Sequence, residues 1–236
     1  MITLRTINEL TLCAECDGAG TLYTKTGAMI GFYGECKFDK VMLGPGGGSA
    51  MGQLFGQIGR RLTGENIPLM QVFSNGPTES YYACQAQHIT VVELMQGEEL
   101  MVESEDLLAF TDTVGYGIKM IGCGIISQKG MFTTVLTGNG PGAQVAFLTN
   151  GNPIVMDTPC CVDPDAMVAF TGPEPNFKSD ISWKNFIGQS SGDSYMLEYR
   201  APGYKFVIQP YERGSGIDVG IDRGRAAYVQ RNPLFR

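Results

Sequence analysis

Histidine is almost missing from this chain of 236 residues, which has a single one, His88. A metal-dependent enzyme on a β-helix usually gathers several histidines with a carboxylate, and a Ser-His or Cys-His catalyst needs a histidine as its base. A single histidine argues strongly against a metal site of this kind. For a Ser-His or Cys-His catalyst, the single histidine would have to be the catalytic base by coincidence. We therefore expect His88 to be an ordinary polar residue on a strand. The chain is predicted not to be an enzyme, with no catalytic, metal or cofactor site.

Basic side chains are also few, since 17 Lys and Arg stand against 24 Asp and Glu and give a net charge of −7. Nucleic acids and anionic membrane surfaces repel such a chain unless basic residues gather locally. Arg60 and Arg61 are adjacent, but no basic residue recurs at matching positions of the repeats described below. We predict that the protein binds no nucleic acid.

Long apolar runs are absent as well. No run of roughly 18 apolar residues occurs, so no membrane span is predicted, and the N-terminal MITLRTINEL resembles neither a signal peptide nor a transit peptide. Seven cysteines without a secretion signal indicate reduced thiols rather than a disulfide framework, which favours the cytoplasm. Cys13 and Cys16 have the spacing of a zinc or redox pair, but no second pair exists to complete four ligands.

Acidic residues are unevenly spread, because residues 93–112 hold seven of them and no Lys or Arg. We interpret this stretch as a solvated rim of turns and outward strand positions. Two alternatives stay open at this point, a paired-carboxylate acid/base site and a cation site. Against both, the carboxylates are consecutive and show no sign of desolvation.

Glycine, in contrast, is abundant, and its 32 residues with 12 Pro divide the chain into short apolar segments. Several segments are rich in β-branched and aromatic residues, and we predict an all-β protein with little helix. The predicted strands are 88–94, 133–138, 143–149, 195–199 and 205–211. One segment, 49–62, has the apolar spacing of a helix, although its glycines weaken it. Its stripe of Leu54, Phe55 and Ile58 is a candidate contact for another subunit or a partner protein.

One pattern recurs three times along the chain. ELMVESEDLLAFTD at 99–112 aligns with PCCVDPDAMVAFTG at 159–172, and TKTGAMIGF at 24–32 aligns with VDPDAMVAF at 162–170. Each copy is followed at a distance by an apolar strand, a turn and another apolar strand. A single unit of this kind exposes sheet edges and buries too little surface alone, so the copies are expected to pack side by side.

The repeats predict one domain over 1–236. We place the three β repeats at approximately 8–92, 93–152 and 153–210, followed by a C-terminal extension, 211–236.

Two glycine-rich stretches resemble nucleotide-binding loops. GNGPGA at 138–143 matches G-x-G-x-x-A, but that fingerprint needs a helix directly after the glycines. Pro141 and the alternating AQVAFLT that follows favour a β-hairpin instead. GPGGG at 44–48 lacks the Gly-Lys-Ser/Thr of a phosphate loop, and we predict a flexible or interface loop there.

Three stretches together carry a family resemblance. TKTGAMIGF, the glycine-rich GPGGGSAMGQLFGQIGRRLTGE and VDPDAMVAF resemble the altered-inheritance-of-mitochondria (mitochondrial biogenesis) family and its bacterial homologues of unknown function. The resemblance implies three tandem copies of a shortened double-stranded β-helix, like subunits of the tryptophan RNA-binding attenuation protein (TRAP). It also implies that three chains close a nine-unit ring. The chain departs from the family pattern in its third copy, at YRAPGYKF, and after Pro210.

Two functions are compatible with these features. The first is a non-enzymatic oligomeric scaffold or assembly protein that forms a homotrimeric ring and contacts itself or an unidentified protein. The alternative is a small-molecule binding protein that uses crevices between the β repeats.

Overall fold

The computed structural model describes residues 1–41, 69–120, 132–178 and 196–210. These residues form strands joined by turns, and their one helical element is a single 3-10 turn, η1 (Ser104–Asp106). The prediction of an all-β protein with little helix is confirmed. The strands are β1 (Ile2–Asn8), β2 (Thr11–Cys16), β3 (Ala19–Lys25), β4 (Met29–Tyr33), β5 (Cys36–Val41), β6 (Leu69–Asn75), β7 (Thr78–Tyr82), β8 (His88–Glu93), β9 (Glu99–Val102), β10 (Leu107–Thr111), β11 (Val114–Met120), β12 (Phe132–Gly138), β13 (Gln144–Thr149), β14 (Ile154–Asp157), β15 (Cys160–Val162), β16 (Met167–Thr171), β17 (Asn176–Lys178), β18 (Met196–Tyr199) and β19 (Lys205–Ile208).

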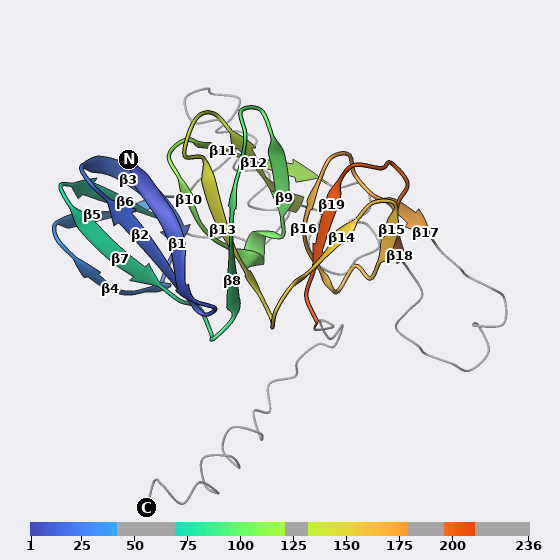
Figure 1. Ribbon diagram of the computed structural model, residues 1–236, viewed down its shortest axis with the longest axis horizontal. Helices are drawn as coiled ribbons and strands as arrows, with labels where there is room; N and C mark the ends of the chain where they lie inside the picture. Colours follow the sequence, from blue (N-terminus) through green and yellow to red (C-terminus); the bar gives the residue numbers. More distant parts are fainter. Residues whose placement is uncertain (42–68, 121–131, 179–195, 211–236) are drawn as a thin grey trace, which may run out of the picture.

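The described strands pair into four antiparallel sheets. The first six-stranded sheet has the order β5-β6-β3-β10-β13-β8, and the second has the order β11-β12-β9-β16-β19-β14. The N-terminal sheet has the order β1-β2-β7-β4, and the C-terminal sheet has the order β15-β18-β17. The sheets follow one another along the longest axis of the molecule, so that β4 lies toward one end and β15, β17 and β18 lie toward the other (Figure 1). Within the described residues, no helix reaches the length and apolar character needed to span a bilayer.

All five strands predicted from the sequence are present, but the hairpin predicted around Gly140 is wrong. β12 lies between β11 and β9 in the second six-stranded sheet, whereas β13 lies between β10 and β8 in the first. Both edges of each strand are therefore already paired. The turn carries the chain from one sheet into another, and the similar turn at Gly76 does the same between β6 and β7.

The two six-stranded sheets pair their central strands in the same register. Ala109 of β10 is opposite Thr24 of β3, and Ala169 of β16 is opposite Val102 of β9. Because a shift of one residue would turn every side chain to the other face, equal register gives the two sheets equivalent inner and outer faces.

A β-bulge recurs at the aligned position of three strands, β4, β10 and β16. The bulge interrupts the pairing of β4 with β7, of β10 with β13 and of β16 with β19. The bulges fall between Met29 and Gly31, between Leu107 and Ala109, and between Met167 and Ala169. The sequence pattern that recurs along the chain therefore marks three strands with the same local irregularity.

Within the described part of the chain, the core consists of three clusters of buried apolar side chains. Phe110 and Phe170 come from aligned positions of β10 and β16, and each is 1% exposed. Tyr23 and Tyr116 stack against Phe110, and Phe206 stacks against Phe170 with ring centroids 5.3 Å apart. Aromatic stacking adds to the burial of apolar surface, so these positions stabilise the contact between neighbouring strands.

Candidate functional site

A group of titratable side chains lies on one face of the N-terminal sheet. Arg5 of β1 is opposite Cys13 of β2, and Cys13 is opposite Tyr81 of β7. Two residues further along β2, Glu15 is opposite Glu79. Because alternate residues of a strand point to the same face, all five side chains project from one face and form what we call the polar group.

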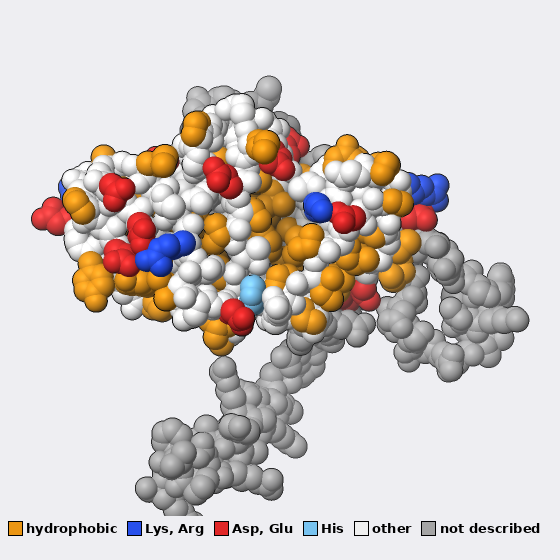
Figure 2. Space-filling view, in the orientation of Figure 1, with side chains coloured by type: hydrophobic (Ala, Val, Ile, Leu, Met, Phe, Trp, Pro, Cys, Tyr) orange, Lys and Arg blue, Asp and Glu red, His pale blue; other side chains and the backbone are white. Residues whose placement is uncertain are grey.

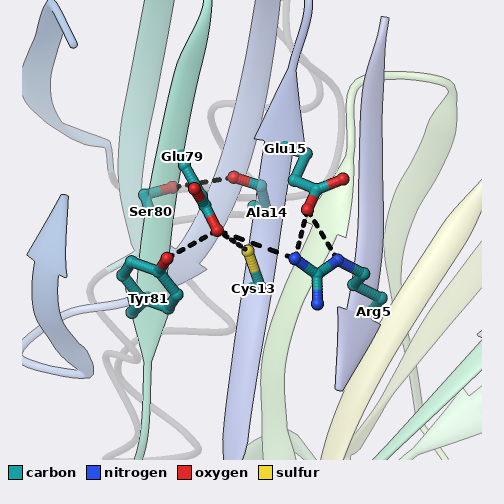
Figure 3. Close-up of polar contacts among 7 residues, drawn as sticks. All are labelled: Arg5, Cys13, Ala14, Glu15, Glu79, Ser80 and Tyr81. Carbon is teal, nitrogen blue, oxygen red and sulfur yellow. Dashed lines mark hydrogen bonds and ion pairs between the residues drawn. The ribbon is translucent and has the colours of Figure 1, made fainter. Parts of the chain in front are cut away.

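Glu79 is the centre of the polar group (Figure 3). Its Oε1 accepts a hydrogen bond of 2.5 Å from the hydroxyl of Tyr81, and the thiol of Cys13 lies 3.5 Å from the same oxygen. Arg5 donates from Nε to Glu15 over 2.6 Å, and its Nη2 lies 3.6 Å from Glu79. The guanidinium of Arg5 therefore lies between two carboxylates and neutralises part of their charge.

These contacts decide which members of the polar group carry a charge at neutral pH. The hydrogen bond from Tyr81, together with the thiol of Cys13 and the charge of Arg5, lowers the pKa of Glu79. The same hydrogen bond raises the pKa of Tyr81 to about 12. Burial, followed by the hydrogen bond to Glu79, raises the pKa of Cys13 to about 12. Glu79 is thus ionised at neutral pH, while the phenol and the thiol keep their protons.

The polar group is poorly suited to catalysis. A nucleophilic cysteine must lose its proton near neutral pH, and Cys13 holds its proton. Cys13, Glu15 and Glu79 each place one possible ligand atom within 4.8 Å of the others, which is a spacing that a cation could use. The guanidinium of Arg5 already pairs with both carboxylates, so a cation would have to displace it. The arrangement is that of a cross-strand polar cluster that stabilises a sheet surface.

A second candidate is the outer edge of β4, which we call the open edge. β4 pairs with β7 on one side, and no other described strand pairs with its second side. Its counterparts β10 and β16 are paired on both sides. An unpaired edge exposes a row of backbone N–H and C=O groups that can pair with another strand.

The open edge also exposes large apolar side chains. Ile30 is 62% exposed, Phe32 is 46% exposed and Tyr33 is 69% exposed, whereas the aligned Phe110 and Phe170 are almost fully buried. Figure 2 shows apolar side chains on the surface at both ends of the row of sheets. The open edge is therefore flanked by exposed apolar side chains, whereas the aligned phenylalanines of β10 and β16 are covered within the same chain.

Leu54, Phe55 and Ile58 lie outside the described residues, as do the whole predicted helix 49–62, the 44–48 loop and the extension 211–236. The predicted contact role of that stripe therefore stays a prediction. His88 lies half-buried on β8, as expected for a residue on a strand, and its Nδ1 has no hydrogen-bond partner among the described residues.

The Cys13 and Cys16 thiols do not act as a pair. The thiol of Cys13 faces Glu79, whereas the thiol of Cys16 faces the carbonyl oxygen of Gly18 at 3.1 Å. Cys16 belongs to the first core cluster and Cys13 to the polar group on the outer face, as strand geometry requires for residues three apart.

The acidic stretch 93–112 is only partly the solvated rim that the sequence predicts. Glu93, Glu98, Glu99, Glu105 and Asp112 are exposed. Glu103 is half-buried. Asp106 is buried at 3% exposure, because η1 turns it inward just before the fully buried strand β10.

Sequence reasoning missed both candidate sites. A signal for the polar group exists, because Cys13 and Glu15 alternate along β2, as Glu79 and Tyr81 do along β7, but their pairing is not encoded locally. A signal for the open edge exists at Tyr33, an aromatic residue at the position that aligns with Thr111 and Thr171.

Comparisons with known proteins agree with this fold. The crystal structure of protein SPYM3_0169 from Streptococcus pyogenes is similar to it, with a TM-score of 0.64 and 17% identity, over 90% of this chain and 94% of that chain. At that level of identity the similarity shows the fold alone. No curated protein matches the chain. The family described as mitochondrial biogenesis AIM24 matches residues 6–211, most of the chain's length, and the chain therefore belongs to the AIM24 family.

Proposed function

We propose that this protein is a non-enzymatic scaffold that assembles with copies of itself into a homotrimeric ring. The observation that carries the proposal is the open edge, where Phe32 is exposed although Phe110 and Phe170 at the aligned positions are buried. An unpaired strand edge with apolar side chains is a hazard for a monomer, and native proteins protect such edges. Pairing with a second copy of the chain would protect this one.

The proposal includes an array of three tandem units of the TRAP-like kind. The units are β2–β7, β8–β13 and β14–β19, and each has six strands. In the first six-stranded sheet, β8, β13 and β10 of the second unit adjoin β3, β6 and β5 of the first. The second six-stranded sheet joins the third unit to the second in the same way. The equal registers and the shared bulges support this arrangement.

An array of this kind has two different ends. Contact between copies is then heterologous, with one end of a chain against the opposite end of the next, and such contacts form rings when the rotation closes. We propose closure after three copies, because the family resemblance implies a ring of nine units and each chain would supply three. A closed ring would leave no free end to extend into a filament.

Two further features support a role other than catalysis and a location in the cytoplasm. The thiol of Cys13 in the polar group keeps its proton, so it is poorly suited to act as a nucleophile. The six cysteines of the described residues are free, which supports a reducing compartment such as the cytoplasm.

Native mass in solution tests the proposal. One chain has a mass of 25.5 kDa, and light scattering on a sizing column should give three times that mass. The mass should hold in high salt, because an apolar strand edge is not screened as surface charges are. A particle with the mass of one chain at micromolar concentration would overturn the proposal.

A further inference from the structure

The two end sheets of the chain match the two halves of a six-stranded sheet. In the N-terminal sheet, the order β2-β7-β4 corresponds to β8-β13-β10 in the first six-stranded sheet and to β14-β19-β16 in the second. The order of the C-terminal sheet, β15-β18-β17, corresponds to β3-β6-β5 and to β9-β12-β11. Each six-stranded sheet joins one half of each kind, through β10 against β3 or through β16 against β9.

From this correspondence we infer that β4 of one chain pairs antiparallel with β15 of a second copy. The pairing completes a third set of six equivalent strands, in a sheet of seven because β1 also pairs with β2. We call this contact the joint. The inference rests on the proposed self-assembly, and it names the two strands, their register and the residues that meet. It requires β15 to have a free edge, and among the described strands β15 pairs with β18 alone.

The register of the joint follows from the pairs within the chain. Ala109 is opposite Thr24, and Ala169 is opposite Val102. In β4 the position that aligns with both alanines is occupied by Gly31, directly after the shared bulge.

On the other strand, Val162 of β15 aligns with Val102 of β9, as the repeated stretches 99–112 and 159–172 show. Gly31 is therefore opposite Val162 of the second copy. The next positions place Phe32 opposite Cys161 and Tyr33 opposite Cys160 of the second copy. A side chain added at Gly31 would meet no atom within 4 Å, so the position has room for the incoming strand.

Packing around Phe32 supports the same register. Phe110 is covered by Tyr116 of the following strand and by Tyr23, which is its neighbour across the strand pair. Phe32 likewise contacts Phe38 of the strand that follows it, with ring centroids 5.4 Å apart. No described side chain of its own chain takes the place that Tyr23 takes over Phe110.

Cys161 is the residue that the register brings to that place, and it is exposed. Its counterpart Met101 in β9 is buried opposite Phe170. Both Met and Cys are small or flexible apolar residues that pack well against aromatic rings. The joint therefore covers two exposed residues in a single contact, Phe32 at one end of the chain and Cys161 at the other.

A disulfide cross-link tests the joint directly. Residues directly opposite each other in an antiparallel pair have Cα atoms roughly 4.5–5.5 Å apart, within the range that a disulfide spans. Phe32→Cys would place a thiol opposite Cys161 of the second copy. Diamide serves as the oxidant, because its N=N bond accepts the two hydrogen atoms that the thiols lose when the S–S bond forms. The products are read on a non-reducing gel.

We expect Phe32→Cys to give cross-linked dimers and trimers, and Cys161→Ser in the same background to abolish them. Ile30→Cys is the matched control, because Ile30 is more exposed than Phe32 but lies in the bulge, outside the register. Random collisions would cross-link Ile30→Cys at least as fast. Equal linking of both variants, or linking that survives Cys161→Ser, would overturn the joint.

Hydrogen exchange on the unmodified chain guards against a variant that fails to assemble. The amides of 31–33 should be protected to a degree similar to those of 109–111, because both would lie in strands paired on two sides. A trimer in which 31–33 exchange as fast as a free edge overturns the joint and leaves the proposed function standing. A monomeric wild-type chain with a fast-exchanging β4 overturns both.

Discussion

Tyr23 stacks on Phe110 with the ring centroids 5.0 Å apart and the ring planes at 16°. The two residues belong to β3 and β10, which pair although they are far apart in the sequence. Phe32 occupies the position in β4 that Phe110 occupies in β10, and no described side chain stacks on it in that way. Phe110 therefore reports on packing within one chain, whereas Phe32 reports on the proposed packing between chains.

Phe110→Ala should destabilise the fold of each chain, whereas Phe32→Ala should weaken the assembly of chains. Phe110 is fully buried, so its truncation should lower the free energy of unfolding by about 3–5 kcal/mol. Phe32→Ala should leave the circular dichroism spectrum unchanged and weaken the contact between copies, so that the native mass falls from that of three chains toward that of one chain on dilution. Its unfolding midpoint in urea should depend less on protein concentration than the wild-type midpoint, which should rise with concentration. A Phe32→Ala chain that keeps the wild-type mass would speak against any role of the open edge.

Gly31 and Gly34 should respond differently to alanine. Gly34 has a φ of +89°, and a side chain there would meet the carbonyl oxygen of Pro77 at 2.5 Å. Gly34→Ala should therefore lower the free energy of unfolding by about 1–3 kcal/mol. Gly31→Ala should be neutral or should stabilise the protein by up to about 1 kcal/mol, because strand glycine is unfavourable and Ala109 and Ala169 occupy the aligned positions. Urea unfolding of both variants checks this, and a costly Gly31→Ala would show that the aligned strands are not equivalent.

Two thiols should differ in reactivity for reasons that the structure separates. Burial raises the pKa of Cys13 to about 12, so almost no thiolate is present at pH 8, and iodoacetamide should leave Cys13 unmodified. Cys161 is exposed in a single chain and covered in the proposed ring. Cys161 should therefore react slowly in the wild-type protein and several-fold faster in Phe32→Ala, as measured by mass spectrometry of the labelled peptides. Equal rates for Cys161 in the two proteins would indicate that assembly does not cover β15.

Much of the fold follows from the sequence because its signals are local. The alternation in 88–94 and 143–149 predicts strands, and the pattern that recurs at 24–32, 102–110 and 162–170 marks three strands that share a bulge. The pairing partners are not local, and this is why the sequence around Gly140 predicts a hairpin that does not form. The residues of a turn do not determine whether the strands on its two sides pair with each other or with other strands.

The candidate sites illustrate the same limit. Phe32, Phe110 and Phe170 follow nearly the same local pattern, yet one is exposed and two are buried. The difference depends on whether another strand covers them, which no window of sequence around Phe32 contains. Asp106 is a similar case, because its acidic neighbours indicate a solvated position and the 3-10 turn that buries it is set by packing around β10.

Small-molecule binding in the crevices between the repeats makes a separate prediction. If the protein is a scaffold alone, a thermal-shift screen against metabolites should give no change in the unfolding temperature. A ligand at 100 times its dissociation constant would instead stabilise the folded state by about 2.7 kcal/mol. A reproducible shift with one metabolite class would favour the binding function over the scaffold.

Stability at acid pH should report on the hydrogen bond between Tyr81 and Glu79. That bond lowers the pKa of Glu79 in the folded state below its ordinary value of 4.5. A lowered pKa means that the folded state favours the ionised carboxylate, so the stabilisation is present above pH 4.5 and is lost as the pH falls through the folded-state value. Tyr81→Phe removes the hydroxyl and should weaken this pH dependence in the range below pH 4.5.

The matched control is Tyr33→Phe. The ring of Tyr33 contacts the ring of Tyr81, with centroids 6.3 Å apart, and Glu79 takes its hydrogen bond from Tyr81. Tyr33→Phe should therefore keep the acid profile of the wild type, measured as urea midpoints across this range of pH. If Tyr81→Phe kept it too, Arg5 and Cys13 would be the groups that hold the Glu79 carboxylate in its ionised form, and the polar group would depend on the ion pair rather than on the phenol.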